Sequence, residues 1–273
     1  MSTYNENARP RVTAARLAAM KREGEKIACI TSYDYTMASI VDAAGIDLIL
    51  VGDSAANVMM GYDTTVPITV DEMITFAKGV VRGARTAMVV VDMPFGSYQG
   101  NPELALANAV RIMKETGAAA VKLEGGEEIR ESIVRILSAG IPVVAHLGLT
   151  PQSVNKFGGY GIRAKEKAEA DKLLADARMV AGLGCCALVL EKIPAQLAAE
   201  VTRSIDIPTI GIGAGSATDG QILVVQDMLG MNKGFRPKFL RMYGDLYDTM
   251  RDAVSRYSAD VKAVDFPSEK EQY

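Results

Sequence analysis

Short apolar runs, many of them rich in β-branched residues, recur along the chain, and each is followed by a longer amphipathic stretch. Near-continuous apolar runs are typical of parallel strands that are covered on both faces. The pattern predicts seven strands, at residues 26–34, 47–53, 87–94, 119–125, 141–149, 187–194 and 207–213, and an eighth near residues 221–231 without clear limits.

The stretches between these runs repeat apolar residues at i, i+3 and i+4, which is the period of an amphipathic helix. Helices are predicted at residues 36–45, 71–84, 102–117, 129–140, 167–184 and 195–205. Eight strands alternating with helices over roughly 250 residues predict a (β/α)₈ TIM barrel of the α/β class. A doubly wound open sheet is the alternative, but no GxGxxG follows the first strand, where the chain reads TSYDYT.

The length of 273 residues fits a single barrel domain, 1–273, with a short N-terminal extension and a C-terminal segment. From Arg236 the pattern predicts one or two amphipathic helices and then the polar tail DFPSEKEQY, which we expect to be mobile or used in subunit contacts. Two connections after strands, residues 54–69 and 151–165, are longer than plain turns. Loops of about 12–15 residues or more usually carry function, and both follow strand C-termini, where barrels hold their active sites.

Composition excludes several classes of protein. The net charge is −3 and the charges are interleaved along the chain, so a nucleic-acid partner is not expected. No apolar run approaches the ~20 residues of a membrane span, and the N-terminus lacks the apolar core of a signal peptide. The three cysteines, Cys29, Cys185 and Cys186, form no CxxC pair. We therefore expect reduced thiols in a cytoplasmic protein, and the single histidine excludes an imidazole-rich zinc site.

Charged side chains stand at the ends of consecutive predicted strands. They are Asp53, Asp92, Lys122 with Glu124, His146 and Glu191. In a barrel these ends meet at one mouth, and three carboxylates gathered there repel one another unless a cation compensates them. Oxygen ligands without thiolates suit Mg²⁺ better than zinc or copper, so the pattern predicts a magnesium site.

Each of these residues also has a plainer interpretation. Any one acid could be solvated or ion-paired at a strand end, and Lys122 could simply pair with Glu124 or Asp92 instead of holding an anionic group of a substrate. A lone histidine is more often structural than catalytic, but the context of His146, between VVA and LGLTPQS, favours the site. Glu191 could lie across the mouth as a base. The glycine-rich turn GIGAG, residues 211–215, could approach a phosphate or carboxylate, although such turns are common.

Six segments together resemble the ketopantoate hydroxymethyltransferase family, in the order of the predicted strands and from about Thr31 to Lys238. They read VGDSAANVMMGYDTTVPITVDEM, VVDMPFGSY, VKLEGG, AHLGLTPQSVNKFGGY, LVLEKIP and IGIGAGSATDGQILVVQDMLGM. The resemblance implies a (β/α)₈ barrel that binds Mg²⁺ and assembles as a homodecamer. It also implies transfer of a hydroxymethyl group from 5,10-methylenetetrahydrofolate to 3-methyl-2-oxobutanoate, giving 2-dehydropantoate for pantothenate synthesis.

The resemblance assigns roles by motif. Asp53, Asp92 and Glu124 match the metal positions, partly through water. The positions that match substrate contacts are Asp53, Ser54, Asp92, Lys122 and His146, and Glu191 matches the general base. The implied chemistry is removal of a proton from the branched carbon beside the ketone, followed by attack of the enolate on the methylene carbon of the folate iminium.

Three departures from the family pattern leave the loop geometry on the folate side open. Ala56 stands where glycine is common, Lys192 where a small or apolar residue is usual, and GGYGIRA replaces a lysine-containing run. The sequence offers no short motif for folate contacts.

Two rival functions can be weighed against the resemblance. Lyases or mutases of the phosphoenolpyruvate mutase and isocitrate lyase type also use Mg²⁺ and 2-oxo acids, but their KxCGH-like loop is absent. A catalytically silent barrel would have lost one or more of the four acids, and all four are present.

Overall fold

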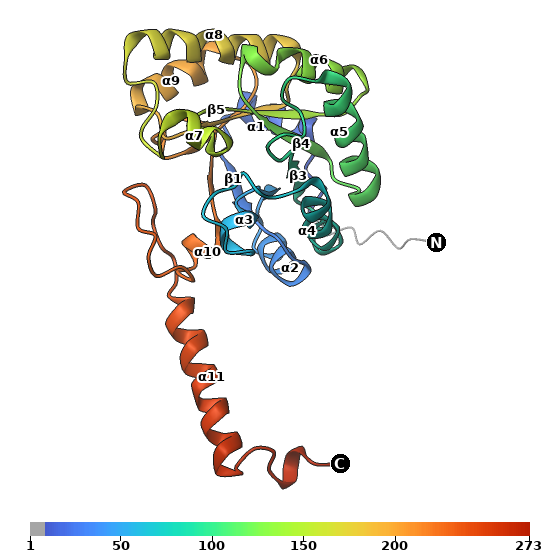
Figure 1. Cartoon of the computed structure of the whole chain (residues 1–273), viewed down its shortest axis with the longest axis vertical. Helices are drawn as coiled ribbons and strands as arrows, with labels where there is room; N and C mark the ends of the chain where they lie inside the picture. Colours follow the sequence, from blue (N-terminus) through green and yellow to red (C-terminus); the bar gives the residue numbers. More distant parts are fainter. Residues whose placement is uncertain (1–8) are drawn as a thin grey trace. The chain divides into compact units, whose positions relative to one another are not determined.

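A computed structural model describes residues 9–273, and in this part of the chain eight parallel strands close into a barrel in sequence order (Figure 1). The strands are β1 Ile27–Thr31, β2 Leu48–Val51, β3 Met88–Asp92, β4 Ala120–Glu124, β5 Val143–Gly148, β6 Ala187–Glu191, β7 Thr209–Ile212 and β8 Gly220–Leu223. The barrel closes because β1 pairs with both β2 and β8. The predicted TIM barrel is confirmed, and each of the first seven strands lies within its predicted range.

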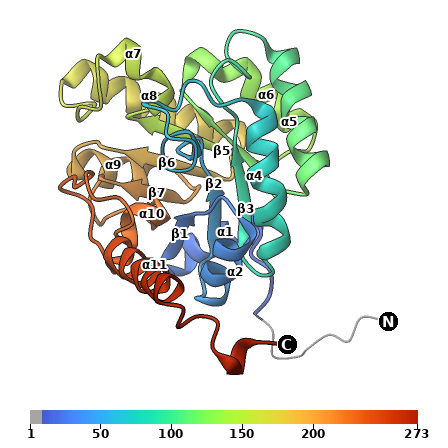
Figure 2. The same cartoon turned by 60° about the horizontal axis from the view of Figure 1, so that its bottom comes forward.

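Helices alternate with the strands in residues 9–223, and two more helices follow the last strand (Figure 2). They are α1 Ala14–Glu23, α2 Tyr35–Ala43, α3 Ala55–Val58, α4 Val70–Gly83, α5 Pro102–Thr116, α6 Arg130–Ser138, α7 Val154–Phe157, α8 Lys167–Leu183, α9 Ala195–Ser204, α10 Val225–Met228 and α11 Leu246–Ala263, with 3₁₀ turns η1 Glu127–Ile129, η2 Pro151–Ser153 and η3 Glu269–Glu271. All six predicted helices are present, and the two long loops contain α3 and α7.

Two local predictions fail. The eighth strand ends at Leu223, and residues that the prediction assigned to it, Val225–Met228, are helical. Helix α1 was not predicted, because its ten residues bury only Leu17 and Met20 and so give a weak apolar period. Its limits come from capping instead. The side chain of Thr13 accepts from the backbone N–H of Arg16, and Gly24 ends the helix in the left-handed conformation.

The inner surface of the barrel is apolar at its N-terminal end. Leu17 and Met20 of α1 pack there against inward-facing residues of the strands, including Met88 and Val90 of β3 and Val144 of β5. Side chains alternate across a strand, so the next inward positions toward the C-terminal ends belong to polar residues. These are Asp92 in β3, Lys122 and Glu124 in β4, His146 in β5 and Glu191 in β6. The fold therefore directs the predicted site residues into the mouth.

The described chain forms two compact units. The first ends at Leu223, and the second, Val224–Tyr273, holds α10 and α11. That the whole chain acts as one domain stays a prediction. None of the helices within residues 9–273 has the length and apolar character needed to cross a bilayer. The three cysteines are unpaired, as expected, although Cys186 is partly exposed.

Gly148 marks a close approach between β5 and β6 beside Glu191. The residues pair in register, and the N–H of Leu149 donates to the carbonyl of Glu191 at 2.8 Å. Gly148 has a φ of 93°, and a Cβ there would lie 2.4 Å from the Glu191 carbonyl oxygen and 2.7 Å from Ile193 Cγ2. Only glycine meets both constraints.

We expect Gly148→Ala to lower the free energy of unfolding by about 3 kcal/mol, because backbone strain and overpacking add. Gly140→Ala is the matched control, since Gly140 has a similar φ of 79° but no atom within 4 Å of its would-be Cβ. Strain alone should cost it about 1 kcal/mol. Urea unfolding measures both values, and equal losses would show that the contact with Glu191 is not tight.

Candidate active site

The predicted site residues lie together at the C-terminal mouth of the barrel. Strand register sets Asp92 beside Lys122, and Glu124 beside His146. Asp53 joins them from the turn after β2, where its backbone N–H donates to Asp92 Oδ2 at 2.9 Å. Gly52 leaves room for this turn, since a Cβ there would lie 2.8 Å from Ser54 Oγ. Ser54 Oγ in turn shares a hydrogen bond of 2.8 Å with the hydroxyl of Tyr33.

Lys122 is the cation at the centre of the cluster. Its ammonium nitrogen lies 3.0 Å from Asp92 Oδ1 and 3.5 Å from Glu124 Oε1, and its side chain is buried. Burial lowers the pKa of this amine, but the attraction of Asp92, Glu124 and Asp53 outweighs burial and raises the pKa above its usual value. Lys122 is therefore a fixed positive charge.

His146 links the cluster to Glu191. Its Nδ1 lies 3.1 Å from Lys122 Nζ, and its Nε2 lies 3.4 Å from Glu191 Oε2. Because a lysine ammonium can only donate, Nδ1 accepts, and we assign the ring proton to Nε2, facing Glu191. Burial first, and then repulsion by Lys122, lowers the pKa of His146. The imidazole is neutral, and its Nε2 lies near the carboxylate of Glu191 without a well-aligned hydrogen bond.

The carboxylates of the cluster carry more negative charge than Lys122 can balance. Burial raises the pKa of Asp53, and repulsion by Glu124 raises it further, to about 6. Burial also raises the pKa of Asp92, to about 7, against the attraction of Lys122. Burial raises the pKa of Glu124 as well. These carboxyl groups therefore retain protons near neutral pH, and a cation bound beside them would displace those protons.

Gln152 is the main site residue that the sequence did not reveal. Its side-chain amide donates to Asp53 Oδ2 at 2.9 Å and to the Met93 carbonyl at 3.0 Å. Its backbone N–H donates to Glu124 Oε2 at 3.0 Å. The hydroxyl of Tyr98 donates to Gln152 Oε1 at 2.7 Å and accepts from the N–H of Glu124 at 3.0 Å. The only signal was the place of Gln152 in the long loop 151–165.

The donor set fits a hard divalent cation. Asp92 Oδ1 and Glu124 Oε1 are buried without a well-aligned hydrogen bond, although both lie near Lys122. Carboxylate oxygens of this kind are the ligands that Mg²⁺ prefers. Across residues 9–273, however, no three His, Cys, Asp or Glu side chains form a ready-made coordination shell. A bound cation would thus complete its shell with water or substrate oxygens.

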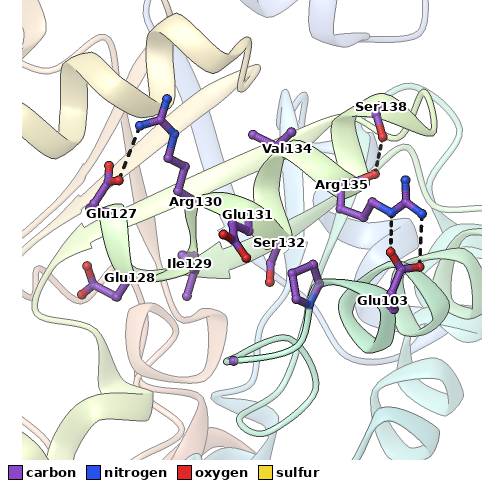
Figure 3. A pocket seen from close by; sticks show the side chains of 12 residues that line it. Glu103, Glu127, Glu128, Ile129, Arg130, Glu131, Ser132, Val134, Arg135 and Ser138 are labelled. Carbon is purple, nitrogen blue, oxygen red and sulfur yellow. Dashed lines mark hydrogen bonds and ion pairs between the residues drawn. The ribbon is translucent and has the colours of Figure 1, made fainter.

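A separate hollow of about 940 Å³ lies between the start of α5 and the segment η1–α6 (Figure 3). Four of its six charged side chains pair with one another: Glu103 with Arg135, and Glu127 with Arg130. It contains none of the predicted site residues. The segment GIGAG begins in β7 and continues into the turn after it, where Gln221 Nε2 donates to the carbonyl of Gly215 at 2.8 Å. The predicted ionisable residues thus gather at the barrel mouth and not in this hollow.

Solved structures of other proteins share this fold. Phosphoenolpyruvate phosphomutase from Streptomyces platensis superimposes with a TM-score of 0.62 at 15% identity, covering 92% of this chain and 88% of that one. A 2,3-dimethylmalate lyase of the PEP mutase/isocitrate lyase superfamily gives 0.59 at 17% identity, with 90% and 88% covered. At such low identity these likenesses show the fold alone.

Sequence relatives are far closer. The 3-methyl-2-oxobutanoate hydroxymethyltransferases of Bacteroides fragilis and Porphyromonas gingivalis are 64% and 60% identical to the chain, each aligned over 100% of both proteins. Residues 11–269 match the family described as ketopantoate hydroxymethyltransferase. Since the family match and these alignments span nearly the whole chain, the chain belongs to the ketopantoate hydroxymethyltransferase family.

Proposed function

We propose that this chain transfers the one-carbon unit of 5,10-methylenetetrahydrofolate to 3-methyl-2-oxobutanoate, giving 2-dehydropantoate and tetrahydrofolate. The observation that carries the proposal is the single buried network at the barrel mouth. It joins Asp53, Asp92, Glu124 and Glu191 through Lys122, His146 and Gln152. Family membership supplies the identity of the substrates.

We propose that Asp53, Asp92 and Glu124 hold Mg²⁺, in part through water. Two buried oxygens that lack a well-aligned hydrogen bond, Asp92 Oδ1 and Glu124 Oε1, and the raised pKa values of Asp53 and Asp92 support this assignment. The chemistry that a bound Mg²⁺ supplies is Lewis acidity, which favours the enolate form of a 2-oxo acid. Ser54 and Lys122 lie beside these acids and offer a hydroxyl and ammonium N–H groups to the substrate carboxylate.

Glu191 is placed to act as the base. Its side chain is 16% exposed, whereas those of Glu124, Asp92 and His146 are at most 4% exposed, so Glu191 opens most toward the mouth. His146 Nε2 lies 3.4 Å from one of its oxygens and is the neighbouring polar group that a small rotation would bring into a hydrogen bond with the carboxylate. Glu191 removes the proton from the branched carbon, and the electron pair moves onto the keto oxygen. One C–N bond of the folate breaks to give the iminium, and the enolate carbon attacks its methylene carbon. Water then displaces the second folate nitrogen and supplies the hydroxyl oxygen, so that tetrahydrofolate leaves with its two nitrogens carrying the proton from the branched carbon and one proton from water.

We also propose that the chain assembles as a homodecamer. Support for self-association comes from an apolar stripe along and beside α11, with alternating spacings of four and three residues. Its members are Tyr243, Tyr247, Met250, Val254, Tyr257, Val261 and Val264, all exposed in the single chain. This heptad spacing is typical of a helix that packs against another helix. The number of subunits rests on the family resemblance, and the unpaired cysteines support a cytoplasmic location.

We expect Glu191→Gln to abolish exchange of solvent deuterium into 3-methyl-2-oxobutanoate, because a carboxamide cannot accept the proton. The rate should fall by about 10³-fold or more, while binding of the keto acid with Mg²⁺ stays within about threefold of the parent. The exchange is followed by NMR. Glu200→Gln on exposed helix α9 is the matched control. Exchange that survives in Glu191→Gln would place the base elsewhere.

The pH dependence of stability tests the crowding of the carboxylates. Because the folded pKa values of Asp53 and Asp92 are raised, the folded state binds more protons than the unfolded state between about pH 4 and pH 7. In protein stripped of divalent ions, the contribution of these two carboxyl groups to the free energy of unfolding should therefore fall as the pH rises through this window.

The variant Asp92→Asn isolates this effect, since asparagine resembles the protonated acid. The stability of the parent minus that of the variant should decrease by on the order of 2 kcal/mol from pH 5 to pH 8, measured by urea unfolding in EDTA. Millimolar Mg²⁺ should restore the loss in the parent. A difference that stays constant or grows with pH would contradict the assignment.

A further inference from the structure

Lys192 and the GGYGIRA run, residues 158–164, meet in space. Lys192, which directly follows Glu191, donates a hydrogen bond from Nζ to the carbonyl oxygen of Tyr160 in the GGYGIRA run. In the opposite direction, the backbone N–H of Arg163 donates to the carbonyl oxygen of Lys192 at 2.8 Å. These two bonds join the turn after β6 to the loop of residues 158–164, and we call them the clasp.

The backbone on both sides of the clasp is held in an unfavourable conformation. Lys192 has a φ of 44° and Ala164 a φ of 54°, both in the left-handed region that L residues other than Asn and Asp rarely adopt. At Lys192 the conformation is held by the clasp and by its own N–H, which donates to the Ile212 carbonyl at 2.9 Å. Strain of this kind persists only where the surrounding contacts fix it, and it often marks functional segments.

The far end of the loop is anchored separately. The guanidinium of Arg163 lies 4.0 Å from the centre of the Phe157 ring and forms an ion pair with Glu169. The N–H of Ala164 donates to the same carboxyl group at 2.8 Å. The loop is thus fixed at both ends, and the exposed residues between them, Tyr160 and Ile162, are presented to solvent from a defined backbone.

Tyr160 lies within electrostatic range of both halves of the site. Partial burial raises the pKa of its phenol, and the charges of Asp53 and Glu191 raise it further. Its side chain is nevertheless 43% exposed. An exposed aromatic ring on a loop that is hydrogen-bonded to Lys192, the residue after the proposed base, offers a flat apolar face to a second molecule that enters from outside.

We propose that Tyr160 forms the docking face for the pteridine ring of methylenetetrahydrofolate, and that Lys192 is the positioning residue that holds this face over the mouth. The inference rests on the proposed function, because it takes the co-substrate from there. The proposed function places the small keto acid beside the polar groups at the mouth. The one-carbon donor is larger and carries a flat heteroaromatic ring, for which the exposed ring of Tyr160, held beside the segment that follows Glu191, offers a stacking surface.

Lys192 can position Tyr160 relative to Glu191 because it is connected to both segments. Its backbone continues directly from Glu191, while its side chain and its carbonyl group bind the loop that carries Tyr160. The clasp therefore fixes the distance between the proposed base and the docking face. Loss of the clasp should weaken folate binding without removing the base.

The first test replaces the aromatic face. Tyr160→Leu should weaken binding of tetrahydrofolate, measured by calorimetry with the full chain, by about tenfold, and should raise the KM for methylenetetrahydrofolate by a similar factor. Tyr160→Phe keeps the ring and should stay within about threefold of the parent. Deuterium exchange into 3-methyl-2-oxobutanoate without folate should change far less than folate binding does in Tyr160→Leu.

The second test separates the hydrogen bond from Lys192 Nζ to the Tyr160 carbonyl from the backbone strain at position 192. Lys192→Ala removes the Nζ donor and keeps the strain, Lys192→Gly removes both, and Lys192→Arg keeps a donor. We expect Ala and Gly alike to weaken tetrahydrofolate binding about fivefold and Arg to restore most of it. Lys114→Ala, at the exposed end of α5, is the matched control.

Three outcomes would overturn the inference. Tyr160→Leu could bind tetrahydrofolate like the parent, Lys192→Ala could do so, or exchange could fall as much as folate binding in either variant. Failure of the proposed function looks different. The parent chain itself would then show neither exchange into the keto acid nor product formation.

Discussion

The central constraint on this structure is that three buried carboxylates surround a single lysine, which leaves negative charge in excess. Asp53, Asp92 and Glu124 are buried together, and Lys122 is the ammonium in contact with two of them. Ions in such surroundings cost free energy unless they are paired and hydrogen-bonded, so neighbouring polar groups must satisfy them. Gln152, Tyr98 and backbone N–H groups do part of this, and they fix the acids in place. Some negative charge remains uncompensated, so the mouth attracts a positively charged ligand.

The barrel creates this surplus through strand geometry. Inward-facing positions alternate along each strand, and they are apolar at the N-terminal end, where Leu17 and Met20 pack against them. At the C-terminal ends of the strands, polar residues occupy the inward-facing positions. The packed interior therefore supports the acids from below and shields them from water, which strengthens every charge interaction among them. Close approach at Gly148 then brings the segment after Glu191 against β5.

Most of the fold and the ionisable part of the site could be predicted from the sequence, because parallel strands and acids at their ends leave a repeated pattern. Gln152 and Tyr98 could not, since a neutral side chain becomes part of a site only through its neighbours. Helix α1 depends on capping by Thr13 and Gly24 rather than on periodicity. The extent of β8 was wrong because QILVVQDM is apolar enough for a strand, yet the chain turns into α10 after Leu223. Lys192 was recognised only as a departure, and its partner Tyr160 required coordinates.

The most direct test of the charge surplus is calorimetric titration of Mg²⁺ into protein stripped of divalent ions, at pH 6.5 in buffers of different ionisation enthalpy. The account predicts that one ion binds per chain with release of protons from the buried carboxyls, and that Asp92→Asn weakens binding by at least about tenfold. Binding without proton release, or binding that is unchanged in the variant, would contradict it.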